Sequence, residues 1–343
     1  MFAGSCRRHI GFTDMPNQFT DDQLLIYANR VKGKVVVITG GASGIGRESA
    51  KLFAKHGSKV VIGDMNAVDG AAVAKAITKE GGEATFIKCD VTNWDEQVAM
   101  FERAIERFGT VDIVIPNAGI NESEEVCWGN LKFVDGKPAE PQLLTVKVNL
   151  IGVLYTTHLA MYYMKLHRSP GAWKSLVIIG SMASWIGLFA AQQYTASKHA
   201  VLGLIRSLDP VVESENIRTA CIHPWFTDTN ILDWQLRTLV AGIPMTPLER
   251  VAGAIFRAAT DPDPTTSGCA WLLPDDGPVL LLRKEDMREG VYDVLNKRVR
   301  RIMSFRSNVL LWLALFRDIG RVLRPVLVSG GIVGLATALY LRS

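Results

Sequence analysis

Cysteine is scarce in this 343-residue chain, and the few cysteines present form no pattern. There are five of them, widely spaced and odd in number, and no two have the CxxC spacing. These features argue against a disulfide framework and against a zinc site, and they fit a reducing compartment. We therefore expect no metal ion and a cytoplasmic location.

Two further absences narrow the class of protein. Residues 1–32 contain no continuous apolar stretch that could serve as a signal peptide. The net charge is only +4, and much of the basic excess borders apolar runs near the end of the chain rather than interleaved aromatic residues. We therefore expect no nucleic-acid partner. The arginines concerned are Arg298, Arg300, Arg301, Arg306, Arg317, Arg321 and Arg324.

Apolar residues are plentiful, at 48%, which allows a sizeable core and excludes global disorder. Apolar runs typical of strands alternate with amphipathic stretches typical of helices. This alternation predicts an α/β protein with a doubly wound parallel sheet, the Rossmann fold. The expected strands are 35–39, 59–63, 83–89, 112–115, 175–180, 217–222 and 270–273; helices are expected at 44–56, 67–79, 94–108, 142–166, 194–213 and 246–260.

The chain divides into three parts. We expect one nucleotide-binding and catalytic domain over residues 33–280. An N-terminal arm over 1–32, with one helical stretch around 21–30, precedes it. A helical and partly apolar tail over 281–343 follows it.

A glycine-rich turn joins the first strand to the first helix. It contains Gly40 and the run Ser43-Gly44-Ile45-Gly46. Glycines let the backbone approach a pyrophosphate closely, and the amides and dipole of the helix N-terminus favour its negative charge. The alternative is a purely structural tight turn, which needs one or two glycines but not this spacing. The turn therefore predicts a dinucleotide site.

An acidic residue indicates which dinucleotide binds. Asp64 ends the second strand, about 20 residues after the glycines. A carboxylate there accepts hydrogen bonds from ribose hydroxyls and repels a 2′-phosphate. No basic residue occupies Ser43 or Met65, where a phosphate partner would be expected. These residues favour NAD over NADP, although Asp64 could also be a helix cap.

A tyrosine and a lysine four residues apart form the candidate catalytic pair. Tyr194 and Lys198 share one face of the predicted helix. An ammonium beside a phenol lowers the phenol pKa, so that the oxygen can exchange a proton with an alcohol or a carbonyl. Ser181 follows the fifth strand, at the carboxyl edge where ligands of such sheets bind. The alternatives are a surface pair for Tyr194 and Lys198, and a turn serine or helix cap for Ser181.

Together these motifs resemble the short-chain dehydrogenase/reductase family over about residues 33–275. The matching positions are Thr39-Gly40, Gly44-Ile45-Gly46, Asp90-Val91, Asn117-Ala118-Gly119, Asn149, Ser181, Tyr194, Lys198 and Pro224.

The resemblance implies a role for each catalytic position. It implies that Ser181 orients the substrate oxygen and that Tyr194 is the acid/base. Lys198 would lower the pKa of Tyr194 and hold the nicotinamide ribose. Asn149 would position a water molecule in the proton relay.

The resemblance also implies cofactor contacts. Asp90, with Val91, and Asn117 would flank the adenosine. Thr229, five residues after Pro224, lies where the family has a threonine that contacts the carboxamide.

Two positions depart from the family pattern. Pro116 replaces the usual Asn before Asn-Ala-Gly, and Trp225 replaces the usual Gly after Pro224. Because glycine allows the backbone to approach the nicotinamide closely, Trp225 puts the local geometry in question. Within the family, Gly63-Asp64 and the segment 272–278 most resemble hydroxyprostaglandin-dehydrogenase-type NAD enzymes.

Aromatic and apolar residues surround the expected substrate site. The loop 121–141 and the segment 225–244 should cover it. Their composition favours a small hydrophobic alcohol or ketone, of the lipid, terpenoid, steroid or polyketide classes. Simple core packing is the alternative. The residues concerned are Trp185, Leu188, Phe189, Trp225, Phe226 and Trp234.

The tail carries its own signal. Residues 309–316 are apolar, and 326–341 is an uncharged run of sixteen residues. That length is at or below the ~17–25 needed to span a bilayer. With the neighbouring arginines, it makes membrane association through 309–343 one of three interpretations of the tail. The alternatives are a helix docked on the domain or one that joins copies of the chain, and we expect a homo-oligomer.

The leading hypothesis is an NAD-dependent oxidoreductase that interconverts a secondary alcohol and a ketone. The alternative, of another class, is a noncatalytic NAD-binding scaffold or regulator that its tail directs to a membrane or partner. A scaffold has no need of Ser181, Tyr194 and Lys198 together, which argues against it.

Overall fold

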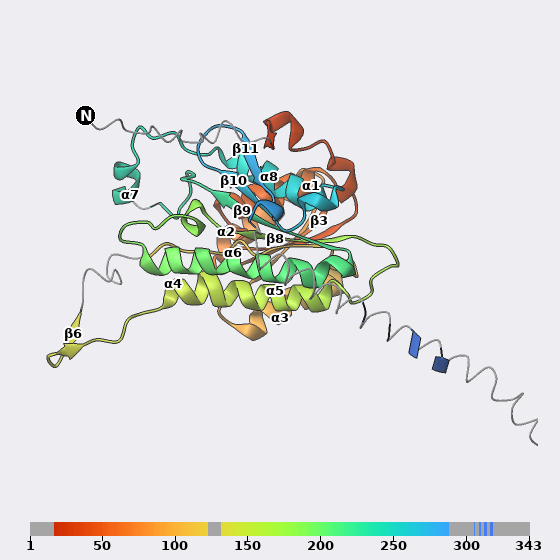
Figure 1. The fold of residues 1–343 in the computed structure, drawn as a ribbon, viewed down its shortest axis with the longest axis horizontal. Helices are drawn as coiled ribbons and strands as arrows, with labels where there is room; N and C mark the ends of the chain where they lie inside the picture. Colours follow the sequence, from red (N-terminus) through yellow and green to blue (C-terminus); the bar gives the residue numbers. More distant parts are fainter. Residues whose placement is uncertain are drawn as a thin grey trace, which may run out of the picture. The chain divides into compact units, whose positions relative to one another are not determined.

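Residues 17–122, 132–232 and 234–287, with six single positions in the tail, are described by a computed structural model of the chain. Its centre is a sheet of parallel strands in the order β4-β3-β2-β5-β8-β9-β10 (Figure 1). The predicted doubly wound Rossmann fold is therefore confirmed. The strands are β2 (Val35–Thr39), β3 (Lys59–Asp64), β4 (Glu83–Lys88), β5 (Ile113–Ile115), β8 (Lys174–Ile179), β9 (Ile217–Pro224) and β10 (Cys269–Leu273).

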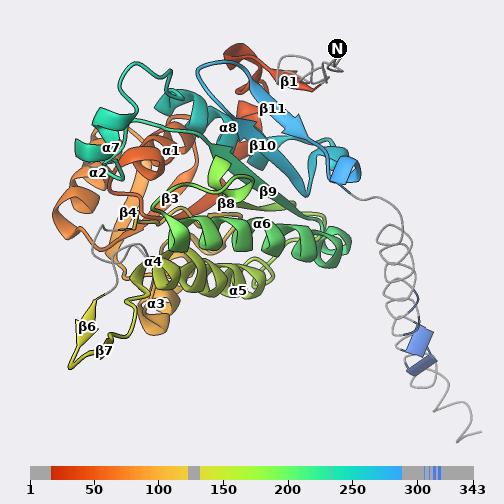
Figure 2. The ribbon, with the colours of Figure 1, turned by 60° about the vertical axis from the view of Figure 1, so that its left-hand side comes forward.

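Helices cover both faces of the sheet (Figure 2). Strand β2 shows why, because Val36 and Ile38 enter one apolar core while Val35 and Val37 enter the other. A strand buried on both faces reads as a continuous apolar run. Helices α1 (Gly44–Lys55), α2 (Ala67–Lys79) and α8 (Leu248–Thr260) lie on the first face; α3 (Trp94–Phe108), α5 (Val153–Tyr163) and α6 (Gln192–Val212) lie on the second.

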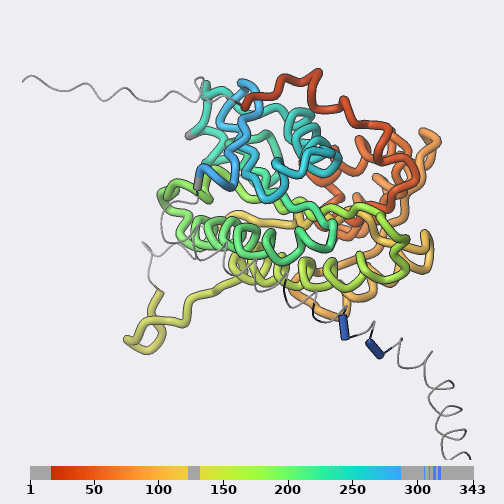
Figure 3. The backbone as a smooth tube through the Cα atoms, turned by 45° about the vertical axis from the view of Figure 1, so that its right-hand side comes forward, coloured from red at the N-terminus to blue at the C-terminus, as the bar shows by residue number. Residues whose placement is uncertain are grey.

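The sheet extends beyond its predicted limits through two antiparallel strands. β11 (Val279–Leu282) pairs with β10, and β1 (Gln18–Phe19) pairs with β11. Figure 3 shows the N-terminal segment running beside these C-terminal strands. The side chain of Phe19 stacks on Trp271, with ring centroids 5.1 Å apart. The described part of the arm therefore belongs to the domain, although residues 1–32 were expected to lie apart from it.

The arm also lacks the expected helix over 21–30. Two short 3-10 helices, Asp21–Gln23 and Ala28–Val31, take its place. Strand β1 could not be predicted either. It has only two residues, too few to show a periodicity, and its partner strand β11 lies some 260 residues away in sequence.

The long helix expected over 142–166 is less regular than predicted. It consists of α4 (Leu144–Val146), a π-helical turn at Lys147–Gly152, and α5. This is the one helix among the described residues that is long and apolar enough to cross a membrane by length and composition. Half of it is buried in the fold, and it packs into the core against α3, so it is a core helix.

The segment before α4 is not a plain loop. In the predicted loop 121–141, β6 (Phe133–Val134) and β7 (Lys137–Pro138) form a small hairpin. The chain after β9 carries a further short helix, α7 (Trp234–Leu239).

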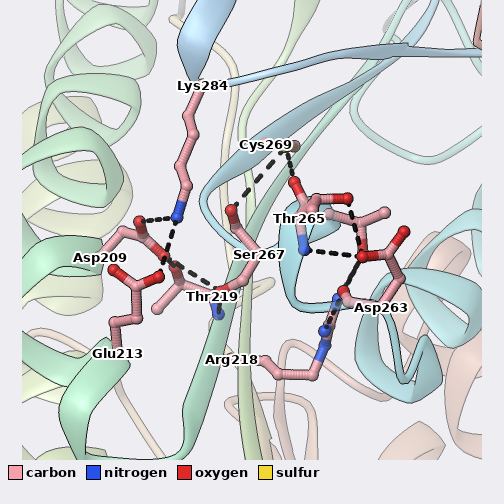
Figure 4. Close-up of polar contacts among 10 residues, drawn as sticks. Asp209, Glu213, Arg218, Thr219, Asp263, Thr265, Ser267, Cys269 and Lys284 are labelled. Carbon is pink, nitrogen blue, oxygen red and sulfur yellow. Dashed lines mark hydrogen bonds and ion pairs between the residues drawn. The ribbon is translucent and has the colours of Figure 1, made fainter.

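A buried ion pair closes the edge of the sheet opposite the carboxyl ends of the strands (Figure 4). The Asp209 carboxylate is fully buried and accepts from the Lys284 ammonium at 2.9 Å. It also accepts from the hydroxyls of Thr219 at 2.9 Å and Ser267 at 3.0 Å. The domain therefore extends to Lys284 rather than ending at 280.

The tail forms a unit separate from this domain, 285–343. Of the predicted apolar run 309–316, the structure describes Val309, Trp312, Leu313 and Phe316, all helical and exposed. Residues 326–341 lie outside the described residues. Membrane association through 309–343 therefore stays a prediction.

Candidate active site

One cavity of about 630 Å³ lies at the carboxyl ends of the parallel strands. Its walls come from the segments that follow β2, β3, β4, β5, β8 and β9, and from the first turns of α6. The strand order reverses between β2 and β5, and ligands of open α/β sheets bind at such a switch point. Every residue predicted to bind cofactor or act in catalysis lines this cavity, except Gly46 and Asn149.

The glycine turn is shaped as a close-fitting cradle. Gly40 has a φ of +65°, and a Cβ on it would lie 2.7 Å from the Cα of Ala118. A Cβ on Gly46 would overlap the carbonyl oxygen of Gly40, and one on Gly44 would lie 3.1 Å from the Thr229 methyl group. Side chains at these positions would clash with the turn itself or with the neighbouring residues Ala118 and Thr229, so the close packing of the turn requires glycine. The turn leads into the N-terminus of α1, which fits a pyrophosphate.

Asn117 holds this turn in place. Its Nδ2 donates to the carbonyl oxygens of Thr39 and Gly40, both at 2.9 Å, and its backbone N–H donates to the Thr39 hydroxyl. Ser43 is the N-cap of α1, but its side chain makes no capping hydrogen bond, so the hydroxyl does not compete for the helix amides. The family resemblance assigned Asn117 to the adenosine, and the structure shows that it also braces the turn.

Asp64 lines the cavity from the end of β3. Its Oδ2 accepts from the N–H of Ala42 at 2.9 Å, and Oδ1 accepts from the N–H of Asn66 at 2.9 Å. Asp64 is not the helix cap that the alternative proposed, because the N-cap of α2 is Asn66. Asp64 therefore ties the second strand to the glycine turn.

Ser181, Tyr194 and Lys198 meet in the cavity. The Ser181 hydroxyl lies close enough to the Tyr194 phenol to lower its pKa. The Ser181 oxygen also accepts from the N–H of Ala183 at 3.1 Å, which fixes its direction. The Lys198 ammonium lies 5.6 Å from the centroid of the Tyr194 ring and donates to the Ile179 carbonyl at 2.9 Å.

Burial dominates the electrostatics of this pair. It raises the pKa of Tyr194, and the neighbouring Ser181 hydroxyl opposes the rise. Burial lowers the pKa of Lys198 to about 8. The expectation drawn from the family, that Lys198 lowers the pKa of Tyr194, stays a prediction. Burial disfavours the charged form of each side chain.

Replacing Lys198 by Met should stabilise the fold at neutral pH. The pKa of Lys198 falls from 10.5 to about 8 on folding, so below that range the folded chain buries a charge that the unfolded chain keeps in water. The gain should reach about 3 kcal/mol at neutral pH. It should shrink as the pH rises from about 8 to 10.5, where the wild-type lysine loses its proton.

Urea unfolding of both proteins across this range checks the prediction. A Lys198→Met gain that does not change with pH would show that the buried charge is not its cause.

Asn149 does not line the cavity but lies behind residues that do. It is fully buried in the π-helical turn, where Oδ1 accepts from the N–H of Ile120 and Nδ2 donates to the carbonyl of Ile120, both at 2.9 Å. A π-turn inside an α-helix often marks a functional site. A Cβ on Gly119 would lie 3.3 Å from Asn149 Oδ1 and 3.8 Å from Lys198 Nζ, so the two side chains border the same glycine.

Trp225 fits where the family has glycine. Among the described residues, the non-glycine positions with positive φ do not include Trp225, so the backbone there needs no glycine. Its N–H donates to the carbonyl of Leu273 at 2.8 Å, and its ring meets Phe226 edge to face. The doubt that the sequence raised about this position therefore does not apply to its backbone.

The predicted apolar residues divide into two groups. Leu188, Trp225 and Phe226 line the cavity. Trp185 packs against His223 beneath it, while Phe189 and Trp234 are exposed. The core-packing alternative is therefore correct for Trp185, and Trp225 both lines the cavity and packs against core residues.

Sequence reasoning missed two buried residues beside the site. His223 Nδ1 lies 3.0 Å from the carbonyl oxygen of Ser181, and burial lowers the pKa of His223 to about 3, which keeps the ring neutral. The Glu122 carboxylate reaches the first turn of α6. A histidine inside a buried strand was a usable signal, whereas the loop around Glu122 gave none.

Comparison with known proteins assigns the family. The sequence profile described as short chain dehydrogenase matches residues 34–238, more than half of the chain. The chain belongs to the short-chain dehydrogenase family. The predicted class, an NAD(P)-dependent oxidoreductase, is thereby confirmed.

Several short-chain dehydrogenases resemble the chain. Short-chain dehydrogenase/reductase ascJ of Acremonium egyptiacum is 35% identical over 233 residues, which cover 67% of this chain and 76% of the relative. The 5'-hydroxyaverantin dehydrogenase of Dothistroma septosporum is 34% identical, covering 59% and 70%. Secoisolariciresinol dehydrogenase of Forsythia intermedia is 35% identical, covering 60% and 70%.

A solved structure supports the same assignment. The 3-ketoacyl-(acyl-carrier-protein) reductase of Brucella melitensis, complexed with NADH, is 26% identical with a TM-score of 0.61. The match covers 72% of this chain and 98% of the reductase.

Proposed function

We propose that this short-chain dehydrogenase interconverts a secondary alcohol and a ketone on a small hydrophobic molecule, with NAD as its cofactor. The observation that carries the proposal is the meeting of Ser181, Tyr194 and Lys198 in the cavity that also contains the glycine turn. When NAD is bound, its nicotinamide ring would accept the hydride from the alcohol carbon.

Each catalytic side chain has a defined task in this proposal. Tyr194 takes the proton from the alcohol oxygen, and the neighbouring Ser181 hydroxyl holds that oxygen. The Lys198 ammonium stabilises the phenolate, and the proton that Tyr194 takes up returns to solvent through a relay water. Asn149 holds the backbone of Ile120 through two hydrogen bonds, and a relay water would bind beside this backbone.

The walls beyond the catalytic pair favour an apolar substrate. Leu188, Trp225 and Phe226 face the cavity there, joined by Ile231 and Leu232. Relatives named as dehydrogenases of 5'-hydroxyaverantin, secoisolariciresinol and borneol support a carbon-rich alcohol.

A panel of hydrophobic secondary alcohols and ketones tests this function, with NADH formation or consumption followed by absorbance. The proposal expects turnover of at least one alcohol class with NAD. The alternative scaffold would bind NADH, seen by its fluorescence, and turn over none of the panel. Binding without turnover would therefore favour the scaffold.

Replacing Asp64 by Ala should narrow the preference for NAD over NADP. The carboxylate faces the cavity at the end of β3, where it would repel a 2′-phosphate. Titrating both cofactors against wild type and variant checks this. Asp90→Ala is a matched control, because it removes a carboxylate from another wall of the same cavity. A wild-type preference for NADP would contradict the assignment of Asp64.

Four further features are proposed from the sequence. They are a nearer relationship to hydroxyprostaglandin-dehydrogenase-type enzymes, a homo-oligomeric state, a cytoplasmic location, and contact of the tail with a membrane.

A further inference from the structure

Glu122 is a buried carboxylate beside the catalytic tyrosine. Its side chain belongs to the segment after β5, and only 6% of the residue is exposed. Oε2 accepts from the backbone N–H of Gln193 at 2.7 Å and of Tyr194 at 3.2 Å. Glu122 also lines the cavity. A charged group from another part of the chain therefore holds the backbone of the acid/base residue itself.

Helix α6 needs such a group because it has no cap of its own. Its N-cap residue, Ala191, offers no side-chain acceptor to the first turn. The first N–H groups of a helix lack partners within the helix, and they carry the positive end of its dipole. By contrast, α2 and α3 are capped by their own Asn66 and Asn93. Glu122 does for α6 from a distance what these asparagines do locally.

The segment that carries Glu122 links three parts of the site. Asn117 donates to the glycine turn, and Asn149 grips the backbone of Ile120 on both sides. Glu122 then reaches α6. The six residues 117–122 therefore connect the cofactor cradle, the π-helical turn and the catalytic helix through hydrogen bonds. A shift of this segment moves the Tyr194 backbone relative to the cradle.

We propose that Glu122 is a positioning residue, which sets the Tyr194 hydroxyl against Ser181 and the cofactor cradle. The inference rests on the proposed function, because it assigns to Tyr194 the proton transfer. Proton transfer is sensitive to displacements of the reacting atoms of about 1 Å. Losing the anchor should therefore slow turnover more than it weakens cofactor binding.

The anchoring uses one carboxylate oxygen. Oε1 is buried and has no hydrogen-bond donor among the described residues. A glutamine can consequently present its amide oxygen to the two N–H groups, while it loses the charge that strengthens these bonds. An aspartate keeps the charge but is one methylene shorter and withdraws from α6. The two variants separate the contact from the charge.

The experiment compares Glu122→Ala, Glu122→Gln and Glu122→Asp in the full chain, with an alcohol that wild type oxidises. We expect Glu122→Ala to lower kcat about 10- to 100-fold, while the Kd for NADH changes less than about twofold. Glu122→Gln should recover most of the lost kcat. Glu122→Asp, which withdraws the carboxylate, should resemble Glu122→Ala.

A matched control separates positioning from loss of stability. Asp263 caps the 3-10 helix Pro264–Thr266 by accepting from the N–H of Thr265. It precedes β10 and so lies toward the amino ends of the strands, away from the cavity at their carboxyl ends. Asp263→Ala should lower the melting temperature and leave kcat unchanged. If Glu122→Ala does not fold, Glu122→Gln and Glu122→Asp still differ in kcat under the proposal.

Equal kcat in wild type and in the folded Glu122→Ala or Glu122→Asp variant would overturn the inference. Tyr194→Phe, measured in the same assay, tests the proposed function separately. If Tyr194→Phe also keeps normal turnover, the proposed function fails; if it loses turnover while the Glu122 variants do not, only the positioning role fails.

Discussion

Replacing Tyr194 by Phe should cut turnover by at least about 10²-fold and leave NAD binding nearly intact. The substitution removes only the hydroxyl that meets Ser181, and the ring still fills its place beside Lys198. Steady-state kinetics with the best alcohol of the panel, together with NADH fluorescence titration, measure both effects.

The pH dependence of the same reaction adds a second test. Tyr194 must be a phenolate to accept the proton, and burial raises its pKa. The phenolate fraction therefore increases only toward alkaline pH. Alcohol oxidation by wild type should therefore increase toward alkaline pH, and this increase should be absent in Tyr194→Phe. The exposed Tyr162 provides the control, since Tyr162→Phe should behave as wild type. Near-normal turnover in Tyr194→Phe would refute the mechanism.

Replacing Lys284 by Ala should destabilise the domain by about 3–5 kcal/mol, because it removes the ammonium that pairs with the buried charge of Asp209. Asp209 is fully buried, and Lys284 is 5% exposed, so water cannot replace the lost ammonium. Urea unfolding of wild type and variant gives the difference. A loss below about 1 kcal/mol would mean that the two hydroxyls that also bind Asp209 suffice.

Two controls place this effect in the buried pair. Lys165 pairs with Glu215 at 2.6 Å with both side chains partly exposed, so Lys165→Ala should cost less than about 1 kcal/mol. Combining Lys284→Met with Asp209→Asn removes both charges and should recover part of the stability lost by Lys284→Ala. A chain ended after residue 280 should be destabilised more than Lys284→Ala, because it also loses the second half of β11 with the buried Leu281, whereas one ended after residue 287 should not be destabilised.

The sequence by itself determined the fold class, and nearly all the catalytic and cofactor-binding residues that it predicted line the cavity. Buried parallel strands read as continuous apolar runs, as in 35–39, and helices read as amphipathic stretches. Each such signal lies within a few residues. The glycine turn, Asp64, Ser181 and the Tyr194–Lys198 pair were visible for the same reason, because their spacing follows from a strand end or from one helix turn.

Only the tertiary structure decided the features that depend on distant parts of the chain. β1 pairs with β11 across most of the sequence, Lys284 meets Asp209, and Glu122 caps α6. None of these partners lies within a local period of the other, so no pattern in the sequence links them. The pKa values of Tyr194 and Lys198 also depend on burial, which the whole fold sets. Local periodicity therefore determines which elements form, and the packing of those elements determines how the site is held and charged.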